Sequence, residues 1–375
     1  MTEAILIKNG YVIRPEKKTI LKEDVAVVDG VIIDCKMARE MHIKNMKEID
    51  ASGCYVAPGF IDMHVHVFKD FTELGIDGDL VGIKQGVTTI VDAGSSGIYD
   101  YKSFKDLMIS RSETEILSFL NISKLGLCGG RSELANLDEL MEVEELKEFL
   151  AKEKTVVGLK ARMSGSVLKG NGIFPLEHAR KLADAADLPI MVHIGNGPPS
   201  LPEILALLRE GDIVTHAFHG KKGGILNEVD ELIQEATDAL KRGAVFDVGH
   251  GTESFSFLTM EKFKKNFRCP FTISTDIYLQ NYNTPVGSLM TTMSKLLALG
   301  FALEEVVECV TLRPAQTLGL KEQGTLENGT RADITLFEID EQEKILFDAA
   351  KREINSKRHL KPYMTIREGK VVYKT

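Results

Sequence analysis

Two of the nine histidines in this 375-residue chain, His64 and His66, stand two positions apart at the end of an apolar run. In a β-strand, residues i and i+2 face the same side, so both imidazoles would point the same way. Two neutral imidazoles gain little from each other and lose solvation when buried, whereas a divalent cation between them would use both as ligands. By itself the short motif leaves an ordinary strand end with two half-exposed histidines as the alternative.

Eight short runs rich in apolar or β-branched residues lie between residues 57 and 278, and most are separated by segments with helical periodicity. The runs are residues 57–66, 88–94, 115–123, 156–164, 189–195, 212–220, 244–251 and 271–278. Helical periodicity covers residues 176–187, 201–211, 225–243, 288–300 and 303–319. This alternation indicates βα units, and eight of them over about 220 residues fit a closed (β/α)₈ barrel. An open doubly wound sheet is the alternative, but no Gly-x-Gly-x-x-Gly follows the first run.

The two ends of the chain have a different pattern. Residues 4–13 and 23–36 alternate in strand fashion around Asn-Gly and Asp-Gly turns, and residues 324–339 and 363–373 have the same style. We therefore predict an α/β fold in which a TIM-like barrel, residues 57–322, carries a small β-sandwich domain formed by both termini. That domain would comprise residues 1–56 and 323–375. The charged segment 340–359 is expected to be a helix or an exposed loop.

Several residues that can bind a metal or transfer a proton fall at the ends of the predicted strands. They are His64, His66, Lys160, His193, His216, His250 and Asp276. In a (β/α)₈ barrel, the C-terminal strand ends and the loops after them build the active site. Singly, each histidine is explained by a hydrogen bond in the core, and Asp276 by a helix cap or turn. Together, converging imidazoles and one carboxylate indicate a metal site.

Lys160 looks out of place in such a set, because an ammonium facing histidine-bound metal would be repelled and costly to desolvate. Burial and nearby cations lower the pKa of a lysine, so its neutral amine becomes available. A neutral amine can take up carbon dioxide and become a carbamate, whose two oxygens can bridge two cations. The sequence alone leaves a salt bridge from Lys160 to a barrel carboxylate as an equal alternative.

Several of these segments resemble the binuclear amidohydrolase superfamily, which includes dihydroorotases, hydantoinases and deacetylases. The matching segments are "GFIDMHVH", "GLKARMS", "MVHIG", "VTHAFHG", "STDIY" and the returning β-segment "GTLENGTRADITLF". The likeness covers nearly the whole chain. Four stretches, "NISKLG", "GLKARMSGSV", "MVHIGNGPPS" and "FDVGHGTESFSF", look most like bacterial deacetylases acting on N-acetylated amino acids and O-acetylated hydroxy acids.

The resemblance implies two divalent metal ions, expected to be zinc. It would make His64 and His66 ligands of the deeper ion and His193 and His216 ligands of the second. Lys160, as a carbon dioxide-derived carbamate, would bridge them. Asp276 would complete the deeper site and act as the general base toward a hydroxide shared by the metals.

Two departures from family patterns affect the choice of activity. Dihydroorotases that resemble this chain carry an arginine two residues after the His-x-His pair, where this chain has Phe68. Deaminases of the superfamily place a glutamate three residues after the histidine of the fifth strand, where this chain has Asn196. Both differences favour the deacetylase interpretation over dihydroorotase and deaminase activity.

The residues near the predicted opening of the barrel should choose the substrate. Arg162 follows Lys160 by two positions, so it shares the inward face and could hold a carboxylate through a bidentate pair. An ion pair with a neighbouring loop acid is the equal alternative. His250 could donate a hydrogen bond to the substrate, with a structural bond to a loop as its alternative. His219 and Lys221 are expected to stay solvated.

The predicted function is therefore a metal-dependent hydrolase that cleaves an acyl group, expected to be acetyl, from the amide or ester of a small carboxylate-bearing substrate. Cyclic amide hydrolysis, of the dihydroorotase or hydantoinase type, is the alternative. A non-catalytic oligomeric relative is the third possibility.

Composition narrows the class of partner. A net charge of −9 argues against a nucleic-acid binder. No run of 18 apolar residues occurs, which disfavours a membrane-spanning helix, and the first residues lack the pattern of a signal peptide. The five scattered cysteines are typical of reduced thiols in a cytoplasmic protein. The expected partner is a small-molecule substrate, and a homo-oligomer is left open.

Overall fold

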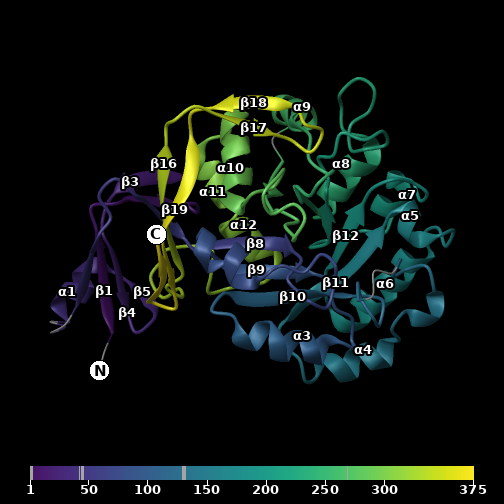
Figure 1. The fold of residues 1–375 in the computed structure, drawn as a ribbon, viewed down its shortest axis with the longest axis horizontal. Helices are drawn as coiled ribbons and strands as arrows, with labels where there is room; N and C mark the ends of the chain where they lie inside the picture. Colours follow the sequence, from purple (N-terminus) through teal and green to yellow (C-terminus); the bar gives the residue numbers. More distant parts are fainter. Residues whose placement is uncertain (1–2, 42, 44–45, 129–131, 268) are drawn as a thin grey trace.

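The centre of the molecule is a sheet of eight parallel strands that follow one another in chain order (Figure 1). The computed structural model describes residues 3–41, 43, 46–128, 132–267 and 269–375. The strands are β8 (Phe60–Val65), β9 (Val87–Ala93), β10 (Glu115–Asn121), β11 (Val156–Met163), β12 (Ile190–Ile194), β13 (Ile213–Thr215), β14 (Val245–Asp247) and β15 (Phe271–Thr272). Apolar and β-branched residues fill them because they are buried on both faces.

The first and last strands of this sheet meet. The backbone N–H of Asp276 donates to the His64 carbonyl at 2.7 Å, and that of His66 donates to the Ile277 carbonyl at 3.0 Å. The chain after β15 therefore lies alongside β8. The prediction of a TIM-like barrel is confirmed.

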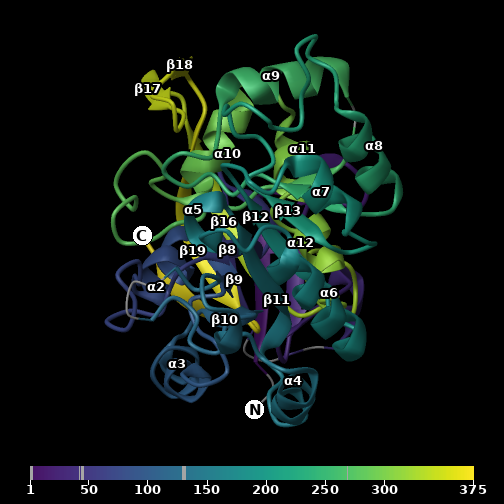
Figure 2. The same cartoon turned by 90° about the vertical axis from the view of Figure 1, so that its right-hand side faces the viewer.

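Helices surround the strands, as Figure 2 shows. They include α3 (Tyr101–Leu107), α4 (Val143–Leu150), α6 (Phe174–Ala186), α7 (Leu201–Ala206), α8 (Gln234–Lys241), α9 (Phe257–Asn266), α10 (Leu289–Ala298), α11 (Leu303–Glu308) and α12 (Leu312–Thr317), with the short α1 (Cys35–Glu40), α2 (Gly78–Val81) and α5 (Gly165–Leu168). In α6, Leu176, Ala179 and Ala183 recur at helical spacing and are buried toward the barrel. Within the described part of the chain, every helix is too short or too polar to span a lipid bilayer.

The predicted helix over residues 225–243 is wrong in its first half, because α8 begins only at Gln234. The Asn227 side chain accepts hydrogen bonds from the backbone N–H groups of Val229 and Glu231. This local turn competes with the helix, as asparagine side chains often do. The predicted helix 303–319 is likewise divided into α11 and α12.

Strands from both termini form two further sheets, which lie together on the left of Figure 1. One contains β1 (Ala4–Lys8), β4 (Val25–Val28), β5 (Val31–Ile33) and β6 (Lys47–Asp50). The other contains β2 (Tyr11–Arg14), β3 (Thr19–Lys22), β7 (Tyr55–Pro58), β16 (Ile334–Asp340), β19 (His359–Arg367) and β20 (Lys370–Lys374). Apolar side chains of both sheets, such as Ile7 and Ile334, share one buried cluster. The division into a separate domain at residues 56 and 323 stays a prediction.

The charged segment 340–359 is neither a helix nor a plain loop. It forms a hairpin of β17 (Lys344–Phe347) and β18 (Glu353–Ser356). The Asp348 carboxylate accepts hydrogen bonds from the backbone N–H groups of Ala350 and Arg352, which fixes the turn between the strands. The same carboxylate accepts from the N–H of Phe257, so the hairpin is held against the start of α9.

Candidate active site

A cavity of about 430 Å³ opens at the C-terminal ends of the barrel strands. Its polar lining comes from seven strands or the loops after them. This lining includes His64, His66, Asn121, Glu133, Lys160, Arg162, His193, Asn196, His219, Lys221, Glu253, Asp276 and Tyr278. The position agrees with the strand-end argument made from the sequence.

The deepest group of possible ligands consists of His64, His66 and Asp276. Asp276 Oδ1 lies 3.3 Å from Nε2 of His64 and 3.3 Å from Nε2 of His66. One ligand atom from each of the three residues falls within 4.8 Å of the others. Asp276 has a φ of 48°, a left-handed backbone conformation that is unusual for a residue with a side chain. Such conformations are concentrated at functional sites.

His193 and His216 form a second pair of converging imidazoles. His193 Nδ1 and His216 Nε2 are 2.9 Å apart. His216 Nε2 lies 4.0 Å from Asp276 Oδ2, so this pair adjoins the deeper group. His216 also has a left-handed backbone, with a φ of 67°. The structure therefore brings both predicted ligand pairs to one carboxylate.

Lys160 projects from β11 into the same centre and is almost fully buried. Its Nζ lies 3.3 Å from His64 Nε2 and 3.4 Å from Met191 Sδ. Burial lowers the pKa of Lys160 to about 8, which favours the neutral amine. Among the described residues no carboxylate forms an ion pair with Lys160, so the salt bridge that the sequence left open has no partner there.

Hydrogen bonds on the outer side of the imidazoles set their tautomers. Thr215 Oγ1 donates its one proton to Asp247 at 2.8 Å. Toward His64 Nδ1, which is 2.8 Å away, the hydroxyl can therefore act only as an acceptor, so Nδ1 carries the N–H. The Gly249 carbonyl, 2.6 Å from His216 Nδ1, likewise requires an N–H there. In both rings the lone pair of Nε2 is left facing the centre. This is the arrangement that metal-binding histidines show.

Burial keeps these rings neutral. It lowers the pKa of His64 and His193 well below the ordinary histidine value, and that of His216 to about 4. Neutral imidazole is the form that binds a cation. These three rings, the His66 imidazole, a carboxylate and an amine with a lowered pKa fit a pair of divalent cations by their chemistry.

Arg162 lies in the cavity wall, but one edge of its guanidinium is already used. Its Nε and Nη2 donate to the two carboxylate oxygens of Glu133, at 2.7 and 2.5 Å. The Glu133 side chain is 1% exposed and that of Arg162 is 30% exposed. The ion pair that the sequence left open is therefore present, and the remaining N–H groups of Arg162 have no partner among the described residues. Its substrate-binding role stays a prediction.

His250 does not join the cavity lining. Its ring is fully buried, with Nδ1 2.8 Å from the Gly251 carbonyl and Nε2 2.8 Å from Lys295 Nζ. Both nitrogens therefore have partners within the protein. The structural hydrogen bond to a loop that the sequence left open is therefore present, and the role of His250 toward a substrate stays a prediction that these contacts do not favour.

The expectation of solvated His219 and Lys221 holds for only one of the two. The Lys221 side chain is 42% exposed and pairs with Glu253 at 3.1 Å. His219 is only 3% exposed, because the chain after β13 folds its ring inward. It lines the cavity with the candidate ligands.

Sequence reasoning missed the residues that support the imidazoles. These are Thr215, which lies between His64 and Asp247, and Ser95, whose hydroxyl is 2.9 Å from His66 Nδ1. Asp247 was detectable in principle, since it is a carboxylate inside the apolar run 244–251. Glu133 follows no strand pattern, and nothing in the sequence pairs it with Arg162.

A barrel with histidines and a carboxylate at its strand ends defines a class of hydrolases that use metal ions at this position. The chain belongs to the amidohydrolase family, which it matches over residues 55–372. It is a hydrolytic enzyme of that family. A deacetylase of Enterococcus faecalis is 39% identical over 378 residues, with 98% of each chain covered.

Two solved structures share the whole fold. A crystal structure of an adenine deaminase has a TM-score of 0.89 and 36% identity, and covers 100% of both chains. A crystal structure of a dihydroorotase has a TM-score of 0.88 and 30% identity, and covers 99% of this chain and 98% of the other. The three proteins carry names of different activities, so the shared fold does not choose between them.

Proposed function

We propose that this enzyme is a metal-dependent deacetylase that cleaves an acetyl amide or ester from a small carboxylate-bearing substrate. The observation that carries the proposal is Asp276, whose carboxylate lies between the His64–His66 pair and His216 with the buried Lys160 beside them. The deacetylase of Enterococcus faecalis supports the choice of activity, because it is similar along almost the whole length.

Two divalent cations, expected to be zinc, would be held by one set of residues each. His64, His66 and Asp276 would hold the deeper ion. His193 and His216 would hold the second, and a carbamate on Lys160 would be shared. When bound, such ions polarise a carbonyl and make water acidic enough to supply hydroxide at neutral pH.

The chain's own residues would then orient the substrate and move protons. Asp276 is placed to accept a proton from the attacking water and to return it to the departing nitrogen or oxygen. The remaining N–H groups of Arg162 would hold the substrate carboxylate at the cavity wall. The Glu133 carboxylate fixes the direction of that guanidinium.

Two side chains support deacetylation over the activities of the similar solved structures. Phe68, at the position of the dihydroorotase arginine, is fully buried and stacks on Phe71 with ring centroids 4.5 Å apart. Asn196, at the position of the deaminase glutamate, accepts a hydrogen bond from Ser164. Neither can bind a carboxylate as an arginine does or transfer a proton as a glutamate does. Cyclic amide hydrolysis remains the second candidate because of the dihydroorotase similarity.

We further propose a cytoplasmic location and one β-sandwich domain built from both termini. All five cysteines are free of disulfides, which fits a reducing compartment. The cluster shared by the two terminal sheets supports a single domain.

The experiment is an assay of zinc-loaded protein against N-acetyl amino acids, O-acetyl hydroxy acids, cyclic ureides and purines. We expect hydrolysis of an acetylated acid with release of acetate. Turnover of a cyclic ureide or a purine, with none of the acetylated acids, would contradict the proposal.

A further inference from the structure

His219 lines the cavity and has a buried polar atom without a partner among the described residues. Its Nε2 has no hydrogen-bond partner among the described residues, although the residue is only 3% exposed. Of the buried side-chain atoms left without a partner in the described part of the chain, this is the one that belongs to the cavity lining. A buried polar group without a partner costs free energy, so we expect His219 Nε2 to bind a ligand or water.

The tautomer of His219 follows from its other nitrogen. The backbone N–H of Lys221 donates to His219 Nδ1 at 3.1 Å, so Nδ1 carries a lone pair. Burial, with the nearby Lys221 charge, lowers the pKa of His219 to about 4, so the ring is neutral at neutral pH. A neutral imidazole with a bare Nδ1 carries its proton on Nε2. The unpartnered atom is therefore a hydrogen-bond donor.

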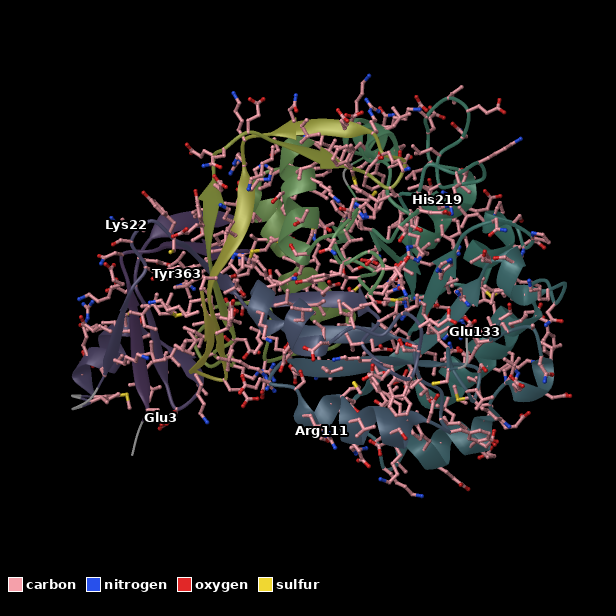
Figure 3. All side chains as sticks on the ribbon, in the orientation of Figure 1. Glu3, Lys22, Arg111, Glu133, His219 and Tyr363 are labelled. Atoms are coloured by element: carbon pink, nitrogen blue, oxygen red, sulfur yellow. The ribbon has the colours of Figure 1, made fainter. Side chains whose placement is uncertain are left out.

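Arg162 and Lys221, two charged donors in the cavity wall, differ from His219 because each has an anionic partner. Arg162 is paired with Glu133, and Lys221 with Glu253 (His219 and Glu133 are labelled in Figure 3). His219 also lies three residues after His216, in the loop above β13. It is therefore not one of the candidate ligands, but it lines the same cavity.

We propose that His219 Nε2–H donates a hydrogen bond to the carboxylate of the substrate and thereby determines specificity for acids. This inference rests on the proposed deacetylase function. A donor-only atom needs an acceptor oxygen, and an ionised carboxylate is the strongest acceptor that a small substrate offers. His219 shares the recognition of the acid with Arg162, from the loop after β13, whereas Arg162 lies on β11.

Two substitutions separate this role from a structural one. In His219→Asn, the amide oxygen can replace Nδ1 as acceptor for the Lys221 N–H, but no donor reaches the place of Nε2. In His219→Gln, the amide nitrogen can occupy the place of Nε2, and the acceptor for Lys221 is lost. A specificity role predicts damage from Asn and rescue by Gln, whereas a purely structural role predicts the reverse.

The first measurement compares kcat/KM of zinc-loaded protein on N-acetylleucine, in both enantiomers, with N-(3-methylbutyl)acetamide, which lacks the carboxylate. We expect His219→Asn to reduce kcat/KM for the acid by about tenfold to a hundredfold, mainly through KM, and to leave the amide nearly unchanged. His219→Gln should keep most of the preference for the acid. Equal preference in wild type and the Asn variant would overturn the inference while leaving the deacetylase function intact.

The second measurement does not depend on turnover. Calorimetry follows the binding of leucine and of 3-methylbutylamine to the same zinc-loaded proteins. Weaker leucine binding in His219→Asn than in wild type and His219→Gln supports the inference even if no acetylated substrate is hydrolysed. Wild-type protein that hydrolyses none of the acetylated acids in the assay described above and does not bind leucine would overturn both the inference and the proposed function.

Discussion

Arg162 and Glu133 form a bidentate ion pair in the wall of the cavity, and the carboxylate is far more deeply buried than the guanidinium. A buried carboxylate without its partner is unfavourable, so Arg162 has a structural role whatever else it binds. The pair also holds the guanidinium in one orientation. The open question is whether its remaining N–H groups bind a substrate.

Arg162→Met should reduce kcat/KM for a carboxylate-bearing acetyl substrate by about tenfold to a hundredfold, because a charge-assisted hydrogen bond is lost. The loss should be much smaller for the methyl ester. Arg162→Lys should restore only part of the lost kcat/KM, since an ammonium lacks the planar pair of N–H donors of a guanidinium. Steady-state kinetics on the matched acid and ester decide the matter. Equal losses on both, together with a lower melting temperature, would leave Arg162 with the structural role alone.

Lys160→Ala should remove about one of two metal ions per chain, because the bridging carbamate could no longer form. Elemental analysis of wild-type and variant protein checks the metal content. Short-chain carboxylic acids should partly restore activity by taking the place of the carbamate. A variant with full metal content and full rate would rule out the bridge.

Asp276→Asn should reduce kcat by about a hundredfold to ten-thousandfold, because an amide cannot accept the proton from water. KM should change little, since the contacts at the cavity wall remain. Metal content must be measured on the same sample, as Asn is a weaker ligand. A variant with full metal content and a near wild-type rate would exclude Asp276 as the base.

Thr215→Val should weaken zinc binding by about tenfold to a hundredfold, because the hydroxyl between His64 and Asp247 is lost. Valine has nearly the same shape, so packing should be preserved. Thr215→Ser keeps the hydroxyl and is the matched control. Competition with a chelator measures the affinity, and equal zinc binding in the Val variant and wild type would show that the hydroxyl has no part in holding the ring.

Lys295 should make stability depend on pH, because burial lowers its pKa to about 7. Between that value and the ordinary lysine pKa, the unfolded chain holds a proton that the folded protein does not, so stability rises with pH. The free energy of unfolding of wild type, relative to Lys295→Met, should increase by about 2 kcal/mol between pH 7 and pH 9.

Urea denaturation at the two pH values measures this difference, and Lys160 contributes equally to both proteins. Lys321→Met replaces an exposed lysine and should show no such change. A difference between wild type and Lys295→Met that is the same at both pH values would mean that Lys295 stays charged in the fold.

Periodicity along the chain was sufficient to predict the barrel and the strand-rich ends. Strand and helix patterns are local, and the carboxyl ends of parallel strands must meet at one face. For this reason His64, His66, Lys160, His193, His216 and Asp276 could be expected together before their distances were known. Local competition was harder to see: the Asn227 side chain stops a helix that the apolar pattern of residues 225–243 favours.

The tertiary structure alone decided which nitrogen of each ring faces the centre, since that depends on partners far away in sequence. Thr215 is 151 residues from His64, and Glu133 is 29 residues from Arg162. Tertiary packing also placed His250 in contact with Lys295 and turned the His219 ring inward, although both histidines follow barrel strands. A sequence states which groups a strand end carries, but loop packing determines which of them reach the cavity and which are already hydrogen-bonded.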